Sequence, residues 1–97
     1  MDHFKLMSEV EVGMKEIQFV TTEHHYHANS FGSWYSLVRY KGREYSLVFD
    51  GRDSSLELRT KDDLTEAVIL NKPKIGLNPK NIISFLKGCE NILDSSL

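Results

Sequence analysis

The stretch SWYSLVRYKGREYSLVFDGRDSSLELR, residues 33–59, carries the strongest strand signals of this 97-residue chain and decides its fold. Two runs rich in aromatic and β-branched residues, 34–40 and 43–49, are separated by only Lys41 and Gly42. A glycine in a two-residue connection can take the positive φ of a primed turn. The pattern therefore predicts a β-hairpin.

This turn also fixes the register of the hairpin. With Lys41 and Gly42 in the turn, Tyr40 lies opposite Arg43, and Trp34 lies opposite Phe49. Side chains alternate along a strand, so each face collects every second residue. The face that we expect to be buried carries Trp34, Val38, Tyr45, Leu47 and Phe49. The other face carries Tyr35, Leu37, Val48 and the opposed charges Arg39 and Glu44.

A third strand follows the hairpin. The segment 50–54, DGRDS, consists mostly of turn formers, and Leu56 and Leu58 then alternate with Glu57 and Arg59. An isolated hairpin is only marginally stable in water, whereas three strands with an apolar face are stable. We therefore expect one antiparallel sheet.

The N-terminal segment has the apolar spacing of an amphipathic helix. Leu6, Met7, Val10 and Met14 fall on one side of a helical wheel, which predicts a helix over roughly the first 14 residues. The segment 15–27 is open between helix and strand, because its run 17–22 contains β-branched Val20, Thr21 and Thr22.

The C-terminal third predicts a second helix. Segment 61–70 fits either a short helix that begins near Thr60 or a buried strand at 68–70. Asn78 and Pro79 then form a helix start, with Asn at the N-cap and proline at the first helical position. The helix 79–93 has an apolar stripe that suits the aromatic face of the hairpin. The expected stripe is Ile82, Phe85 or Leu86, Cys89, and Ile92 or Leu93.

These elements describe one α+β domain that spans residues 1–97. We expect an antiparallel β-meander of three to five strands, packed by an N-terminal helix and a C-terminal helix. No apolar run approaches the roughly 20 residues of a membrane span, and the N-terminus lacks the pattern of a signal peptide. The single cysteine, Cys89, excludes an internal disulfide and fits a core position. We expect a cytoplasmic protein without membrane contact.

Acidic residues are concentrated after the hairpin. The formal net charge is only -2, but the segment 50–66 carries Asp50, Asp53, Glu57, Asp62, Asp63 and Glu66 against Arg52, Arg59 and Lys61. The chain has no basic stripe that would follow a phosphate backbone, so we expect no direct binding of nucleic acid.

The segment 23–27, EHHYH, is the most unusual in composition and raises the possibility of a metal site. In a strand, His25 and His27 point from the same face, but two imidazoles make only half a site. We expect no metal and no cofactor. A small nuclease built from these histidines with Tyr26 and Lys15 is an alternative, although general acid and base residues normally stand on opposed sides of a substrate. No nucleophile, phosphate-loop or dinucleotide motif occurs in the chain.

The hairpin YKGREYSLVFDG, residues 40–51, and the acids downstream of it give the chain a resemblance to small bacterial immunity proteins. The immunity proteins that it resembles belong to contact-dependent growth inhibition systems, and these proteins are small, acidic single domains. It implies a role, the binding and blockade of one toxin domain by a monomer, and it carries over no particular residues.

From the charge pattern we expect a basic toxin domain, such as a nuclease, as the partner. The expected contact residues are Asp50, Asp53, Glu57, Asp62 and Asp63, with Tyr35 and Tyr26 as aromatic anchors. The alternative is another small binding module, such as a phage-encoded inhibitor or a regulatory subunit. A histidine-based or metal-dependent enzyme is the third class.

Overall fold

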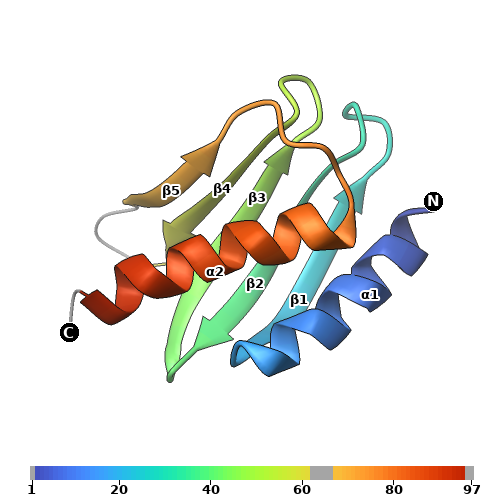
Figure 1. The fold of residues 1–97 in the computed structure, drawn as a ribbon. Coiled ribbons are helices and arrows are strands. Elements are labelled where there is room, and N and C mark those ends of the chain that lie inside the picture. Colours follow the sequence, from blue (N-terminus) through green and yellow to red (C-terminus); the bar gives the residue numbers. More distant parts are fainter. Residues whose placement is uncertain (1, 62–66, 96–97) are drawn as a thin grey trace.

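The computed structural model describes residues 2–61 and 67–95. In order along the chain, its elements are α1 (His3–Glu16), β1 (Phe19–His27), β2 (Ser33–Tyr40), β3 (Arg43–Asp50), β4 (Ser55–Thr60), β5 (Val68–Lys72) and α2 (Pro79–Ser95). The strands form one antiparallel sheet in the order β1-β2-β3-β4-β5, and both helices cover the same face of it (Figure 1). The expected α+β meander with helices at both ends is confirmed.

The predicted hairpin is confirmed together with its register. Tyr40 pairs with Arg43 and Trp34 pairs with Phe49. Lys41 and Gly42 have φ angles of 49° and 79°, as a turn of the I′ type requires at both central positions. The rings of Trp34 and Phe49 stack with their centroids 5.8 Å apart.

The segment that the sequence left open after α1 is a strand. Asp2 caps α1, because its Oδ1 accepts a hydrogen bond of 3.0 Å from the backbone N–H of Lys5. The helix ends at Glu16, and Gln18 follows with a φ of 64°, in the left-handed region. The chain then reverses, and Phe19 begins β1 fully buried against the ring of Tyr40, at 4.5 Å between centroids.

The third predicted strand is β4, and it pairs with both β3 and β5. In the second open segment the structure shows strand β5 from Val68, while residues 62–66 of the alternative short helix lie outside the described residues. The start of α2 is confirmed: Asn78 Oδ1 accepts a hydrogen bond of 2.8 Å from the N–H of Asn81.

The core lies between the sheet and the two helices. Each helix contributes one stripe, namely Leu6, Met7, Val10 and Met14 from α1 and Ile82, Phe85, Leu86 and Cys89 from α2. Cys89 is fully buried, and this burial raises the pKa of its thiol to about 12, which suppresses the reactive thiolate. Among the described residues, no helix is long and apolar enough to cross a membrane.

The structure predicts that Trp34 is a principal contributor to stability. Its side chain is 1% exposed and stacks on Phe49, so Trp34→Ala should lower the free energy of unfolding by about 3 to 5 kcal/mol. Phe31→Ala is the control, because Phe31 is 66% exposed and its loss should cost less than about 1 kcal/mol. Urea unfolding of both variants measures the difference. Equal midpoints for Trp34→Ala and the parent chain would contradict the core assignment.

Candidate functional site

The sheet face turned away from the helices is the principal candidate for a functional surface. Strand pairing places one row of side chains across this face, from β1 to β5. This row, called the central row below, consists of His25, Tyr35, Val48, Glu57 and Asn71. Both helices lie on the other side of the sheet, so no described helix covers the row (Figure 1).

Tyr35 is the aromatic centre of this face. The imidazole of His25 stacks on its ring with centroids 4.7 Å apart, and His27 lies at 6.2 Å. These contacts come from cross-strand pairing of β1 with β2. Tyr35 is half-buried although no helix covers it, so its ring is held in one place by its neighbours. A rigid aromatic ring on an open surface suits a binding anchor.

Glu57 lies in the same row, but its charge is balanced within the sheet. Its Oε1 accepts a hydrogen bond of 3.2 Å from the side-chain amide of Asn71, and Arg59 Nε donates to its Oε2. The Glu57 side chain is only 16% exposed. Glu57 therefore contributes much less to the external field than its charge in the sequence suggests.

Asp50 and Asp53 are the exposed acids of this end of the molecule. Asp50 ends β3 next to buried Phe49, so alternation turns it toward the open face. Its Oδ1 accepts a hydrogen bond of 2.9 Å from the N–H of Arg52, which holds the turn. In residues 2–61 and 67–95, no basic side chain forms an ion pair with Asp50 or Asp53. Both carboxylates are available to a partner.

Tyr26, the other expected anchor, lies on the opposite side of the sheet. It pairs with Trp34, and its ring stacks on His3 of α1 with centroids 3.8 Å apart. A flat partner surface that covers Tyr35 does not reach Tyr26. The structure thus brings Asp50, Glu57 and Tyr35 to one face and separates Tyr26 from them. The expected contact residues Asp62 and Asp63 lie outside the described residues.

The histidine-rich segment is divided between the two faces of the sheet. His25 and His27 share one face, as the sequence predicted, and that face is the open one, whereas His24 points toward α1. Its Nε2 lies 2.6 Å from Nε2 of His3, and its Nδ1 lies 2.6 Å from Oγ of the buried Ser36. This chain of polar contacts joins α1 to the first two strands. The His3 to His24 hydrogen bond requires one of the two nitrogens to carry a proton and the other to be free.

The surroundings of this histidine pair favour the neutral rings. Burial lowers the pKa of His24 below its ordinary value of 6.5, and the neighbouring His3 and His25 lower it further. Burial also lowers the pKa of His3, while the nearby Asp2 partly offsets the effect. Protonation of both rings removes the hydrogen bond and places two cations side by side. We therefore expect the contact between α1 and β1 that His3 and His24 form to weaken in acid.

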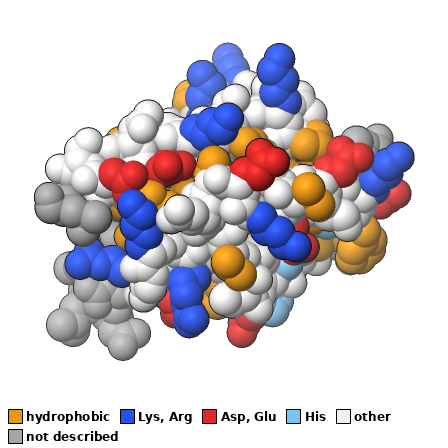
Figure 2. All heavy atoms as spheres, turned by 60° about the horizontal axis from the view of Figure 1, so that its bottom comes forward, with side chains coloured by type: hydrophobic (Ala, Val, Ile, Leu, Met, Phe, Trp, Pro, Cys, Tyr) orange, Lys and Arg blue, Asp and Glu red, His pale blue; other side chains and the backbone are white. Residues whose placement is uncertain are grey.

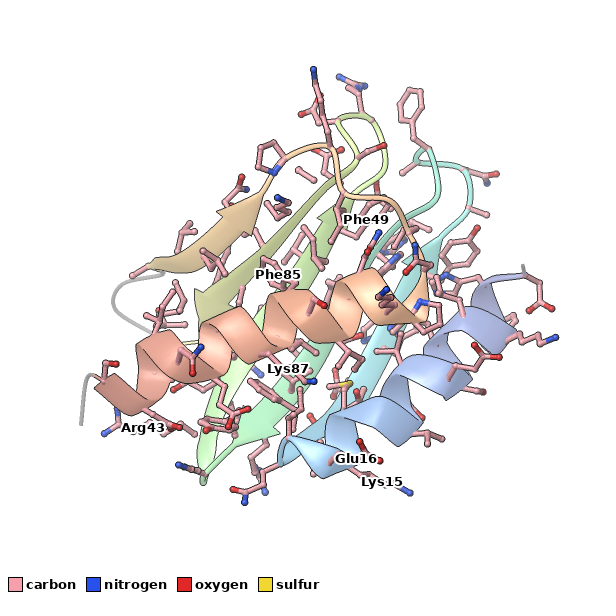
Figure 3. The ribbon with its side chains drawn as sticks, in the orientation of Figure 1. Lys15, Glu16, Arg43, Phe49, Phe85 and Lys87 are labelled. Atoms are coloured by element: carbon pink, nitrogen blue, oxygen red, sulfur yellow. The ribbon has the colours of Figure 1, made fainter. Side chains whose placement is uncertain are left out.

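The residues of the nuclease alternative are not assembled into one site. His24 and Tyr26 face the helices, whereas His25 and His27 face the open side. Lys15 stands near the end of α1 that is remote from His3 (Figure 3). Lys15 lies twelve positions after His3 in α1, about 18 Å along the helix axis. No group of three or more His, Cys, Asp or Glu side chains within residues 2–61 and 67–95 is placed to hold a metal ion.

Phe31 is an exposed aromatic residue that the sequence analysis did not select. It has a φ of 59° in the turn between β1 and β2, and its side chain is 66% exposed under the guanidinium of Arg52 at 4.9 Å. Gly51 allows the turn of Phe31 to approach this closely, because a Cβ at position 51 would lie 1.9 Å from the carbonyl oxygen of Phe31. The two turns are therefore interlocked. Their close approach is not visible in the local sequence of either turn.

The side of the molecule that is lowest in Figure 1 carries charges of both signs. Figure 2 shows Lys and Arg side chains alternating with Asp and Glu, with single hydrophobic side chains between them and no broad area of one sign.

Comparison of the chain with protein-family models, with curated proteins and with solved structures gave no match. Functional inference therefore rests on the open face and on the chemistry of the individual residues.

The histidine pair predicts a loss of stability in mild acid. Because the pKa values of His3 and His24 are lowered in the folded chain, the unfolded chain binds more protons below the ordinary value of 6.5. Stability should be full above that pH and fall as the pH drops through the lowered pKa values. Thermal unfolding measured between about pH 5 and 7.5 tests this, a range in which histidine titrates.

His24→Gln should reduce this acid sensitivity, because one of the two titrating rings is removed. His27→Gln is the matched control, since His27 is exposed on the open face beside Tyr35, whereas His24 bonds His3 of α1. The assignment is wrong if the parent chain keeps its stability throughout the range, or if both variants change the profile equally.

Proposed function

We propose that this chain is an immunity protein, an inhibitor that binds a bacterial toxin domain and blocks its active site. The observation that carries the proposal is the open sheet face, where the anchor Tyr35 shares a surface with the exposed carboxylate of Asp50. Asp53 stands in the adjoining turn. This arrangement combines a fixed aromatic ring with charge that no ion pair of the described chain neutralises.

The arrangement suits a partner with a basic active site. A nuclease domain must attract phosphates, so its active site carries positive charge, and carboxylates presented there exclude the substrate. Opposite charge accelerates encounter, while a buried aromatic anchor slows dissociation. In this proposal Asp50 and Asp53 steer the approach, and Tyr35 holds the complex. The inhibitor acts as a monomer in the cytoplasm, where a toxin that degrades nucleic acid reaches its target.

Expression of the chain together with the toxin domain encoded next to its gene tests this function. We expect the chain to protect cells from that domain and to form a stable one-to-one complex with it, which purification of the pair and growth assays measure. The control is a Trp34→Ala variant, whose core is weakened. It shows whether protection requires the folded chain or only its expression. If the neighbouring genes encode no toxic protein, or if the pair does not associate, the immunity proposal fails.

The proposed division of roles predicts separate kinetic effects for the charges and the anchor. Asp50→Asn with Asp53→Asn should slow association several-fold at low salt and change dissociation little. Asparagine at position 50 retains an oxygen that can accept the turn hydrogen bond from Arg52. Tyr35→Ala should instead speed dissociation by roughly tenfold or more. Surface plasmon resonance at two salt concentrations measures both rates.

The matched control is Glu9→Gln with Glu11→Gln, which removes the same charge from the exposed side of α1. This variant should associate at nearly the parent rate. Equal slowing by both double variants would show that only net charge matters. Unchanged rates in all variants would place the interface elsewhere on the chain and leave the inhibition itself to be judged by the protection assay.

A further inference from the structure

A cavity of about 450 Å³ lies between β5 and the N-terminal half of α2. Its size falls within the range of small-molecule pockets, roughly 300 to 1,000 Å³. It is formed by β5, by the loop 73–78 and by one side of α2, and it is separate from the central row except at Asn71. The proposed function does not use it.

The base of this cavity is apolar. Leu70 of β5, Ile75 of the loop and Phe85 of α2 line it, and the last two are only 7% and 6% exposed. Figure 3 shows Phe85 on the edge of α2 nearer to β4 and β5, with Lys87 on the other edge. The N–H of Ile75 donates a hydrogen bond of 2.7 Å to the carbonyl of Ser54, which fixes the loop wall.

Gly88 of α2 lies beside Leu70 of β5 at the apolar part of the cavity. A Cβ added at Gly88 would be in ordinary van der Waals contact with Cδ2 of Leu70, at 3.4 Å. Toward the start of α2 the walls are polar instead. Asn81 donates a hydrogen bond of 2.9 Å from its side chain to the carbonyl of Gly76, and the hydroxyl of Ser84 stands at the exposed rim.

Both charged side chains of the lining are lysines. Lys72 and Lys74 flank Pro73 and are exposed, and neither forms an ion pair with residues 2–61 or 67–95. Within residues 2–61 and 67–95, no acid lines the cavity. The cavity thus has an apolar base, and the charged side chains of its described lining are positive.

We propose that this cavity binds an amphipathic anion, a single carboxylate on an apolar body the size of a medium-chain acyl group. The apolar body lies against Leu70, Ile75 and Phe85 and points toward Gly88. The carboxylate lies between the ammonium groups of Lys72 and Lys74. Burial of the apolar body contributes most of the binding free energy, and the two lysines select the sign of the head group.

Sodium decanoate, kept below the concentration at which it forms micelles, is the probe for this site. Calorimetric titration of the parent chain should show one saturable site, and backbone amide shifts in NMR spectra should change at residues of β5, the loop 73–78 and α2. Decylammonium and inorganic phosphate are the comparison ligands. Both should bind at least about tenfold more weakly, because one reverses the charge of the head group and the other lacks the apolar body.

Two independent variants test the assignment. Lys72→Glu with Lys74→Glu should weaken decanoate binding by about tenfold through the head group. Ser84→Phe, at an exposed helical position, should weaken it similarly by filling the opening. The matched control is Lys80→Glu with Lys87→Glu, the same charge change on α2 outside the cavity lining, and it should bind decanoate within about twofold of the parent.

Four results would overturn the proposal. They are no saturable decanoate binding by the parent chain, equal affinity for decylammonium, equal weakening by the control variant, and amide shifts confined to residues away from the cavity. None of them bears on the immunity proposal, since that interface is tested by the toxin and by the variants on the open face.

Discussion

The pairing of β2 with β3 is the constraint on which the rest of the structure depends. The turn at Lys41 and Gly42 sets its register, and the register decides which residues meet the helices. If β2 slipped by one residue against β3, Trp34 would turn to the open side and Tyr35 would enter the core, while Phe49 stayed inside. Burial of the large rings thus excludes other registers, and the same selection leaves Tyr35 as a fixed ring on the uncovered face.

Local sequence was sufficient for the hairpin and for α2, because a two-residue turn and an N-cap with proline are short-range signals. It was insufficient for the segment after α1. There the alternation of β1 is interrupted by a bulge between Thr21 and Glu23, which exchanges the faces of all later residues in the strand. His24 is turned inward and His25 outward for this reason. The location of a bulge depends on pairing with β2, so no count along β1 alone predicts it.

The charge of the candidate surface illustrates a second limit of sequence analysis. Glu57 and Asp50 are equivalent in a count of acids, but Glu57 is matched by Arg59 and by Asn71 of the next strand. Within the part of the chain that the structure describes, Asp50 bonds a backbone N–H of its own turn and no basic side chain. The difference arises from the neighbours that the sheet supplies. Phe31 is a parallel case, since its exposure follows from the close approach of Gly51 in another turn. The identity of a side chain follows from the sequence, whereas its availability to a binding partner depends on the fold.

A sheet covered by helices on one side only has two different surfaces, and in this chain they meet at β5. The backbone of this edge strand pairs on one side with β4 alone, so its side chains are less enclosed than those of the inner strands. Asn71 holds Glu57 in the central row and also lines the cavity beside α2. The two surfaces are thus separate in their chemistry but share one side chain, that of Asn71.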